Sequence, residues 1–425
     1  MNTIRKTIRM ILPRVASILY YRRQYKKYLN GIDFSVDKTK KTILAINHFY
    51  DQDLEACQLS NKDFNFIILD GPTLFKSAKE FFSSDVIHIH IAYSSEKKSN
   101  LLAWKHESEK IYKLISQKIG FEYLLMPSDS FYWIREFVLL AKEQKVSTII
   151  LDKEGTISPF HFKNESLRLK KNVPILSEYA FVWSKRQKEY LEKKGMSPKK
   201  VMVLGQARSD LFHLKHTNFL KDVIGNANLP LIVFFSYEDD AYIHPSKQSS
   251  QNPLSWKGMK KETHEILSAL AQKYEGEYNF IIKTHPQQSD LVELQTQYNR
   301  SNLKVIGGSN ISNELIQKAK LIVAFQTTIV TEAMYLNKNT IYTYWDKNIP
   351  LLKDDLLPFH KAKGIEIVNS KENFEDKITN FLMDPQDFNY TSQELEEKAS
   401  FVENYLYKPD GNTCNRFFNE IKKLR

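Results

Sequence analysis

The chain has 425 residues, of which 42% are hydrophobic and 26% are charged. This length is too great for one compact domain of ~100–200 residues, so we expect two domains that each bury a substantial core. The composition is that of a soluble globular protein. The two cysteines, Cys57 and Cys414, exclude a disulfide framework and a zinc cluster, and they fit the reducing cytoplasm.

The net charge is +11, from 61 Lys and Arg against 50 Asp and Glu. This excess suits a phosphorylated ligand, an anionic membrane surface or a nucleic acid, and does not choose among them. Residues 1–30 are basic, lack acidic side chains and have apolar residues at helical spacing. Such a segment either lies on the inner face of the cytoplasmic membrane or packs on the domain with its basic face in water. No run approaches the ~18 apolar residues of a membrane span.

From Lys41 the chain alternates between apolar runs and helical or polar segments. This alternation predicts an α/β fold with a doubly wound parallel sheet in a first domain, residues 31–211. Ligands bind outside the carboxyl ends of the strands in such sheets. The expected strands lie within 41–47, 64–70, 85–93, 122–129, 147–155, 180–184 and 200–210. The candidate site residues that follow these strand ends are His48, Asp129, Asp152, Glu154 and Arg208.

A second domain, residues 212–385, repeats the alternation. Its expected strands lie within 229–240, 279–286, 304–308, 321–328, 339–345 and 365–369. Residues 386–425 form a C-terminal unit with two expected helices, near 392–407 and 412–424, and no strand between them.

The most informative stretch of the second domain is Asn279–Lys338. It begins with a buried strand that ends at Lys283, and His285 and Pro286 follow directly. Proline fixes the local backbone, so we expect the His285 imidazole to point into the site.

The same stretch continues with a second buried strand, a hydroxyl-rich turn and a helix. Gln326, Thr327 and Thr328 stand where the strand ends. Free backbone N–H groups at such a helix start favour an anion such as a phosphate. Glu332 lies about one turn into the helix, within reach of a nucleotide ribose. The alternative is an ordinary Thr-capped helix after a core strand.

The order Lys-x-His-Pro, strand, Thr-Thr and then x-x-x-Glu-Ala resembles the donor-binding half of GT-B glycosyltransferases. More narrowly, it is similar to capsule and surface-polysaccharide transferases related to the teichoic-acid glycerophosphotransferases. The resemblance covers most of the chain from about Lys41. It implies two Rossmann-type domains that face a cleft, with C-terminal helices that cross back onto the first domain.

The resemblance also implies a nucleotide-activated sugar as donor and a polysaccharide or lipid-linked glycan as acceptor. In that group a His-Pro element and a Ser/Thr-rich turn hold the donor phosphates. The donor-binding residues that we predict are Lys283, His285, Gln326, Thr327, Thr328, Glu332 and Arg208. GT-B enzymes generally need no metal, so we expect neither a metal nor another cofactor.

The acceptor-side candidate is the acidic turn that contains Asp152, Glu154 and Gly155. A carboxylate there can take the proton of an acceptor hydroxyl if its pKa lies near the working pH, or act as a nucleophile in a retaining enzyme. The alternative is a capping Asp152 and a solvated Glu154. The resembled group has a similar turn, and we favour Glu154 slightly over Asp152 as the base. His48 and His285 are two further catalytic candidates.

A Gly-x-x-Arg-x-Asp element closes the first domain in the resembled group, and Gly205, Arg208 and Asp210 match it. Arg208 either reaches an anionic ligand across the cleft or pairs with Asp210 at the domain hinge. The Asp410-Gly411 pair is similar to the turn before the last helix of the glycerophosphotransferases.

Three functions agree with these observations to different degrees. The first is a glycosyltransferase that builds a surface polysaccharide such as capsule or lipopolysaccharide. The second is a CDP-polyol phosphotransferase of the same broad group, for which His244-Pro245 would be a second His-Pro element. The third is a nonenzymatic nucleic-acid-binding protein, and the dispersed basic residues beyond residue 30 argue against it.

Overall fold

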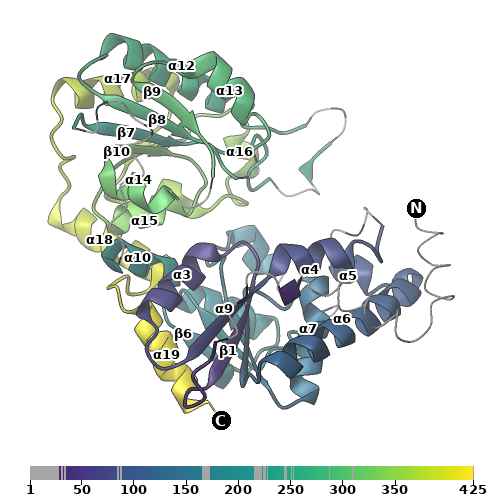
Figure 1. Ribbon diagram of the computed structural model, residues 1–425. Helices are drawn as coiled ribbons and strands as arrows, with labels where there is room; N and C mark the ends of the chain where they lie inside the picture. The colour runs from purple at the N-terminus through teal and green to yellow at the C-terminus, as the bar shows by residue number, and fades with distance from the viewer. Residues whose placement is uncertain are drawn as a thin grey trace.

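The computed structural model shows two α/β domains joined by C-terminal helices (Figure 1). The residues that the structure describes are 28–29, 32, 35–83, 86, 89–164, 173–214, 223, 226, 228–243, 247–249, 251, 253–286, 288–308 and 311–424. Apart from Tyr28 and Leu29, the basic segment 1–30 lies outside these residues, as does the His244-Pro245 pair. Within the described part of the chain, no helix is both long and apolar enough to cross a membrane.

The first domain contains a six-stranded parallel sheet in the order β2-β1-β3-β4-β5-β6. The strands are β1 (Thr42–Asn47), β2 (Asn65–Asp70), β3 (Tyr123–Met126), β4 (Ser147–Leu151), β5 (Tyr179–Val182) and β6 (Val201–Val203). The helices described are α3 (Asp51–Ser60), α4 (Gly71–Ala78), α5 (Ile89–Ala92), α6 (Lys98–Lys118), α7 (Tyr132–Glu143), α9 (Lys185–Lys193) and α10 (Leu211–Leu214). Successive strand residues alternate between two apolar cores, one on each face of the sheet.

The prediction of a strand within 85–93 was wrong. Ile89–Ala92 form the short helix α5, and β1 pairs directly with β3. Among the described residues of this segment, Val86, Ile89 and Ala92 are buried, and they recur every third position. This helical spacing decided the local structure over the alternation of Ile and His.

The second domain also has six parallel strands, in the order β12-β11-β10-β7-β8-β9. They are β7 (Leu231–Phe235), β8 (Asn279–Lys283), β9 (Leu303–Ile306), β10 (Ala319–Ala324), β11 (Asn339–Thr343) and β12 (Glu366–Val368). The helices described are α12 (Lys257–Lys273), α13 (Leu291–Tyr298), α14 (Ser312–Lys318), α15 (Ile329–Tyr335), α16 (Ile349–Leu352) and α17 (Lys371–Met383). From β7 the next strands are added on one side of the sheet, as β8 and β9, and the later strands are added on the other side, beginning with β10. Rossmann-type sheets bind ligands at such a point, where the strand order reverses.

The last two helices connect the domains, as expected from the sequence. α18 (Ser392–Leu406) contributes Val402 and Leu406 to the core of the second domain. α19 (Thr413–Lys423) returns to the first domain, where Phe417 packs edge-on against Phe181 of β5 at 5.4 Å between ring centroids. Figure 1 shows α19 along the edge of the first domain.

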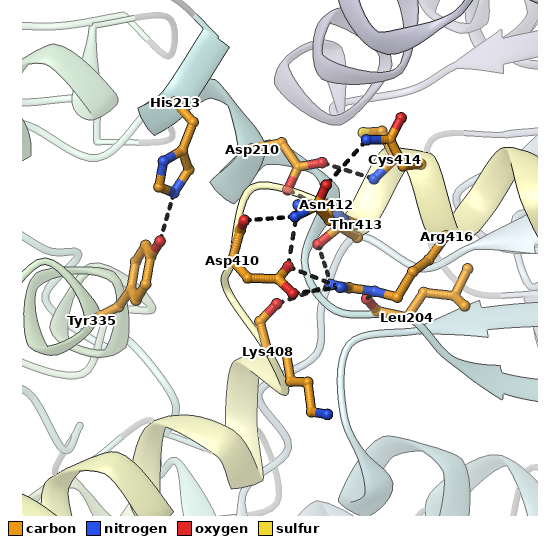
Figure 2. Close-up of polar contacts among 11 residues, drawn as sticks. Leu204, Asp210, His213, Tyr335, Lys408, Asp410, Asn412, Thr413, Cys414 and Arg416 are labelled. Atoms are coloured by element: carbon orange, nitrogen blue, oxygen red, sulfur yellow. Dashed lines mark hydrogen bonds and ion pairs between the residues drawn. The ribbon is translucent and has the colours of Figure 1, made fainter.

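The start of α19 is held by the buried carboxylate of Asp210 (Figure 2). Asp210 accepts hydrogen bonds from the backbone N–H groups of Thr413 at 3.1 Å and of Cys414 at 2.7 Å. Nearby, Arg416 Nη1 donates to both carboxylate oxygens of Asp410, at 2.8 and 2.9 Å. Asp210 therefore satisfies two N–H groups that the first turn of a helix leaves free.

Gly205 allows this close approach. Its φ of +104° lies in a region that residues with a side chain rarely adopt. A Cβ atom at this position would lie 2.9 Å from Thr413 Oγ1. The glycine of the Gly-x-x-Arg-x-Asp element is thus required by the packing of α19.

We expect Asp210→Ala to lower the free energy of unfolding by about 2–5 kcal/mol, because two buried N–H groups lose a charged acceptor. Asp410→Ala is the matched control, since its ion pair with Arg416 is partly exposed and contributes only about 0–1 kcal/mol. Urea-induced unfolding followed by circular dichroism measures both. Equal losses in the two variants would contradict the assigned role of Asp210.

Candidate functional site

The carboxyl ends of the two sheets meet where the domains touch. Tyr242, which follows β7, lies close enough to the side chain of Thr156, in the turn after β4, for that group to influence its pKa. Gln206, after β6, donates from Nε2 to Glu332 Oε1 in α15 at 2.8 Å. The domain boundary therefore runs along the edges where ligands bind in open α/β sheets.

His285 lies two residues beyond the end of β8 and belongs to this boundary. Its Nδ1 lies 3.4 Å from Glu238 Oε1, and 46% of its side chain is exposed. Burial lowers the pKa of His285, while the carboxylates of Glu238 and Glu154 oppose that shift. The imidazole is therefore mainly neutral at pH 7. Because a carboxylate faces Nδ1, the favoured tautomer carries its proton there, and Nε2 becomes a donor only when the ring is protonated.

Lys283, at the end of β8, places an almost buried ammonium group near His285. Its Nζ donates to the carbonyl of Thr284 at 2.6 Å, and it forms no ion pair with a carboxylate of the described residues. Burial lowers the pKa of Lys283 to about 8, and its charge helps to lower the pKa of His285. A buried cation of this kind is stabilised by an anion that reaches it.

The turn after β10 differs from the predicted arrangement at Gln326. This buried residue has a φ of +45°, and its amide donates to Tyr342 Oη at 2.6 Å and to the carbonyl of Leu357 at 3.0 Å. Its Oε1 also accepts from the N–H of Leu357 at 2.9 Å. The side chain of Gln326 therefore holds the turn in place, and a direct contact with the donor does not fit these bonds.

Thr327 and Thr328 are half-buried in the same turn. The N–H of Ile329 lies 3.4 Å from Thr327 Oγ1, and the N–H of Val330 donates to the carbonyl of Thr327 at 3.2 Å. Oxygen atoms within the turn therefore accept from some of the backbone N–H groups that we expected to be free. The helix α15 has only seven residues.

Glu332 and Arg208 take part in a contact between the domains. The guanidinium of Arg208 lies 4.8 Å from the ring centroid of Trp183, and its Nε lies 3.9 Å from both Asp53 Oδ2 and Glu332 Oε1. Glu332 is only 3% exposed and accepts from Gln206, so its carboxylate takes part in the contact between the domains, and its contact with a ribose stays a prediction. Asp210 binds α19, which also excludes the hinge pair of Arg208 with Asp210.

The acidic turn after β4 places two carboxyl groups in different surroundings. Asp152 is half-buried, and its Oδ1 accepts from the backbone N–H of Glu154 at 3.0 Å. Burial is the main cause that raises the pKa of Asp152 to about 7, and the charge of Glu154 adds to this shift. The side chain of Glu154 is 77% exposed and lies 3.4 Å from Lys153 Nζ. The raised pKa of Asp152 suits a base that works near neutral pH.

His48 lies among aromatic rings at the end of β1. Its ring centroid is 4.3 Å from that of Phe49, 4.8 Å from Phe131 and 4.9 Å from Trp133. Burial lowers the pKa of His48 to about 4, so the ring is neutral at pH 7. The imidazole is only 3% exposed, which favours a packing role over direct proton transfer.

Sequence reasoning did not single out Glu238, Tyr242, Gln206 or Lys153. Each follows a strand end, and the same rule that selected Asp152 and His285 would have included them. Asp129, which was selected, instead accepts from the backbone N–H groups of Leu176 and Ser177 and anchors that loop.

Neither a protein-family profile nor a curated protein matches the sequence. Solved structures do resemble the fold. The wall teichoic acid polymerase TagF aligns with 99% of this chain and 97% of its own, at 12% identity and a TM-score of 0.54.

Two nucleotide-sugar enzymes align over similar lengths. The UDP-GlcNAc 2-epimerase of Methanocaldococcus jannaschii covers 91% of this chain and 100% of its own, at 15% identity and a TM-score of 0.53. The S. aureus MnaA structure with UDP covers 90% of this chain and 96% of its own, at 14% identity and a TM-score of 0.52. These likenesses, with the two six-stranded parallel sheets and the returning α19, confirm the GT-B fold.

Proposed function

We propose that this protein is a glycosyltransferase that moves a sugar from a nucleotide-activated donor to a cell-surface polysaccharide or glycolipid. The observation that carries this proposal is the pairing of two groups across the domain boundary. On one side stand Lys283 and the His285–Glu238 pair, which suit phosphate. On the other side stands Asp152, whose pKa of about 7 suits a base. The Glu154 carboxylate influences His285, which supports the closeness of the two groups.

In this proposal the acceptor hydroxyl attacks C1 of the donor sugar while Asp152 takes its proton. The bond between C1 and the phosphate oxygen breaks, and the leaving nucleotide carries away the bonding electrons. Protonated His285 then donates from Nε2 to the oxygen that gains negative charge, and Lys283 adds a nearby positive charge. Such donors contribute most when the charge develops in the transition state.

Membrane attachment through residues 1–30 is part of the proposal, because a polysaccharide or glycolipid acceptor is assembled at the membrane. The basic and amphipathic character of that segment in the sequence supports it.

A thermal-shift panel tests the donor class. It contains UDP, UDP-GlcNAc, CDP, CDP-glycerol and GDP, each added to the full-length chain. We expect the nucleoside diphosphates of the true donor to raise the melting temperature by mass action. A shift with CDP-glycerol alone would instead favour polyol-phosphate transfer. Epimerisation of UDP-GlcNAc without any acceptor would overturn the transferase, and binding of DNA without any nucleotide shift would favour the nucleic-acid alternative.

We expect Asp152→Asn to lower the turnover rate by ~10²-fold or more, because an amide cannot accept the acceptor proton. In the parent enzyme the rate should rise with pH as Asp152 loses its proton near pH 7, and it should fall again where His285 loses its proton. The variant should lose this rise. Glu154→Gln tests the base favoured from the sequence. A larger loss in Glu154→Gln than in Asp152→Asn would return the role to Glu154.

We expect His285→Ala to keep the fold and to lose about 2–4 kcal/mol of transition-state stabilisation, the contribution of one donor to a developing charge. Nucleotide binding at pH 7 should also take up a proton, because phosphate raises the pKa of the imidazole, whereas Lys283 with a pKa of about 8 is already mostly charged. Calorimetry in buffers of different ionisation enthalpy measures this uptake. The matched control is His106→Ala on α6, whose side chain is exposed. If His285→Ala took up as many protons as the parent, the proposed position of the donor phosphate beside His285 would be wrong.

A further inference from the structure

Phe49 presents an aromatic ring to solvent at the carboxyl end of β1. Its side chain is 69% exposed, while its neighbour His48 is buried. Its φ of +57° lies in the left-handed region, where bulky residues are uncommon. Strained residues of this kind persist where the surrounding structure holds them, and they gather at ligand sites. A single exposed apolar residue is ordinary on a protein surface, so the backbone strain and the neighbours of Phe49 carry the inference.

A rigid aromatic base supports the ring. His48 packs against Phe49, Phe131 and Trp133, and the rings of Phe131 and Trp133 stack at 4.8 Å between centroids. Trp133 in turn contacts Phe75 at 4.5 Å. Because these rings hold one another, the exposed face of Phe49 has a defined orientation.

The ammonium of Lys153 lies over two of these aromatic rings. Lys153 Nζ lies 5.3 Å from the ring centroid of Phe49 and 5.6 Å from that of Phe131. The same ammonium lies 3.4 Å from Glu154 Oε1, in the acidic turn that contains Asp152. An apolar ring bordered by a cation and a carboxylate matches a sugar, which has an apolar C–H face and a rim of hydroxyl groups.

The position in the fold agrees with a ligand site. β1 pairs with β2 on one side and with β3 on the other, so the direction of the chain across the sheet reverses there. Ligands bind at such reversal points, outside the carboxyl ends of the strands. Asp152 follows β4, which is the neighbour of β3 on the far side from β1.

We propose that the exposed face of Phe49 binds a sugar ring of the acceptor glycan, with Lys153 hydrogen-bonding to the ring hydroxyl groups. This inference rests on the proposed transfer to a glycan and names the surface that receives it. Phe49 positions the acceptor beside Asp152 and takes no part in proton transfer.

The test measures binding of the full-length protein to an array of sugar-ring oligosaccharides that contain N-acetylhexosamine. The array also carries poly(glycerol phosphate), which has no ring. We expect the parent to bind ring-containing glycans, Phe49→Ala to bind them about tenfold more weakly, and Phe49→Trp to retain binding. Phe49→Gly separates binding from folding, because glycine relieves the positive φ while removing the ring. It should keep or raise the melting temperature and still lose glycan binding.

Leu102→Ala on α6 is the matched control, since this exposed apolar residue lies far from the strand ends in sequence and should leave glycan binding unchanged. Parent-like binding by Phe49→Gly would overturn the inference, as would binding of poly(glycerol phosphate) alone or of no glycan on the array. If no nucleotide shifts the melting temperature but glycan binding still requires Phe49, the donor proposal fails and this surface stands. If nucleotides bind but glycan binding is independent of Phe49, the donor proposal stands and the proposed role of Phe49 fails.

Discussion

The relative position of the two halves of the site depends on the guanidinium of Arg208. It stacks on Trp183 and lies between Asp53 of the first domain and Glu332 of the second. Burial raises the pKa of both carboxyl groups, and the charge of Arg208 opposes this in each case. Two nearly buried acids with one cation between them tolerate little displacement, because either acid left alone would be an uncompensated charge.

This contact separates two kinds of polar residue along the boundary. Glu332 of the second domain contacts both Gln206 and Arg208 of the first domain, and these contacts join the domains. His285, Lys283 and Asp152 also have shifted pKa values, and each follows or ends a strand at this boundary.

The α19 crossing adds a second link between distant parts of the chain. Asp210, seven residues beyond β6, binds the helix start 203 residues later in the sequence, and Phe417 packs against the first sheet. The helix buries one face of the sheet whose other face is covered by α4, α6 and α7. The strand ends that carry His48, Asp152 and Arg208 are therefore held by a sheet packed on both sides.

The alternation of apolar runs in the sequence predicted the strands of both parallel sheets, apart from the false strand within 85–93. The polar residues after predicted strand ends identified most of the residues discussed at the domain boundary. Local patterns carry this information because burial and periodicity are short-range properties of the chain. Only the tertiary structure decided which polar groups are already bonded. Gln326 and Glu332 form hydrogen bonds with residues that are distant in the sequence. Burial raises the pKa of Asp152, and the sequence around Asp152 and Glu154 does not reveal that burial. Desolvation and long-range pairing depend on the assembled chain, so residue type and spacing alone could not show that Asp152 is more buried than Glu154.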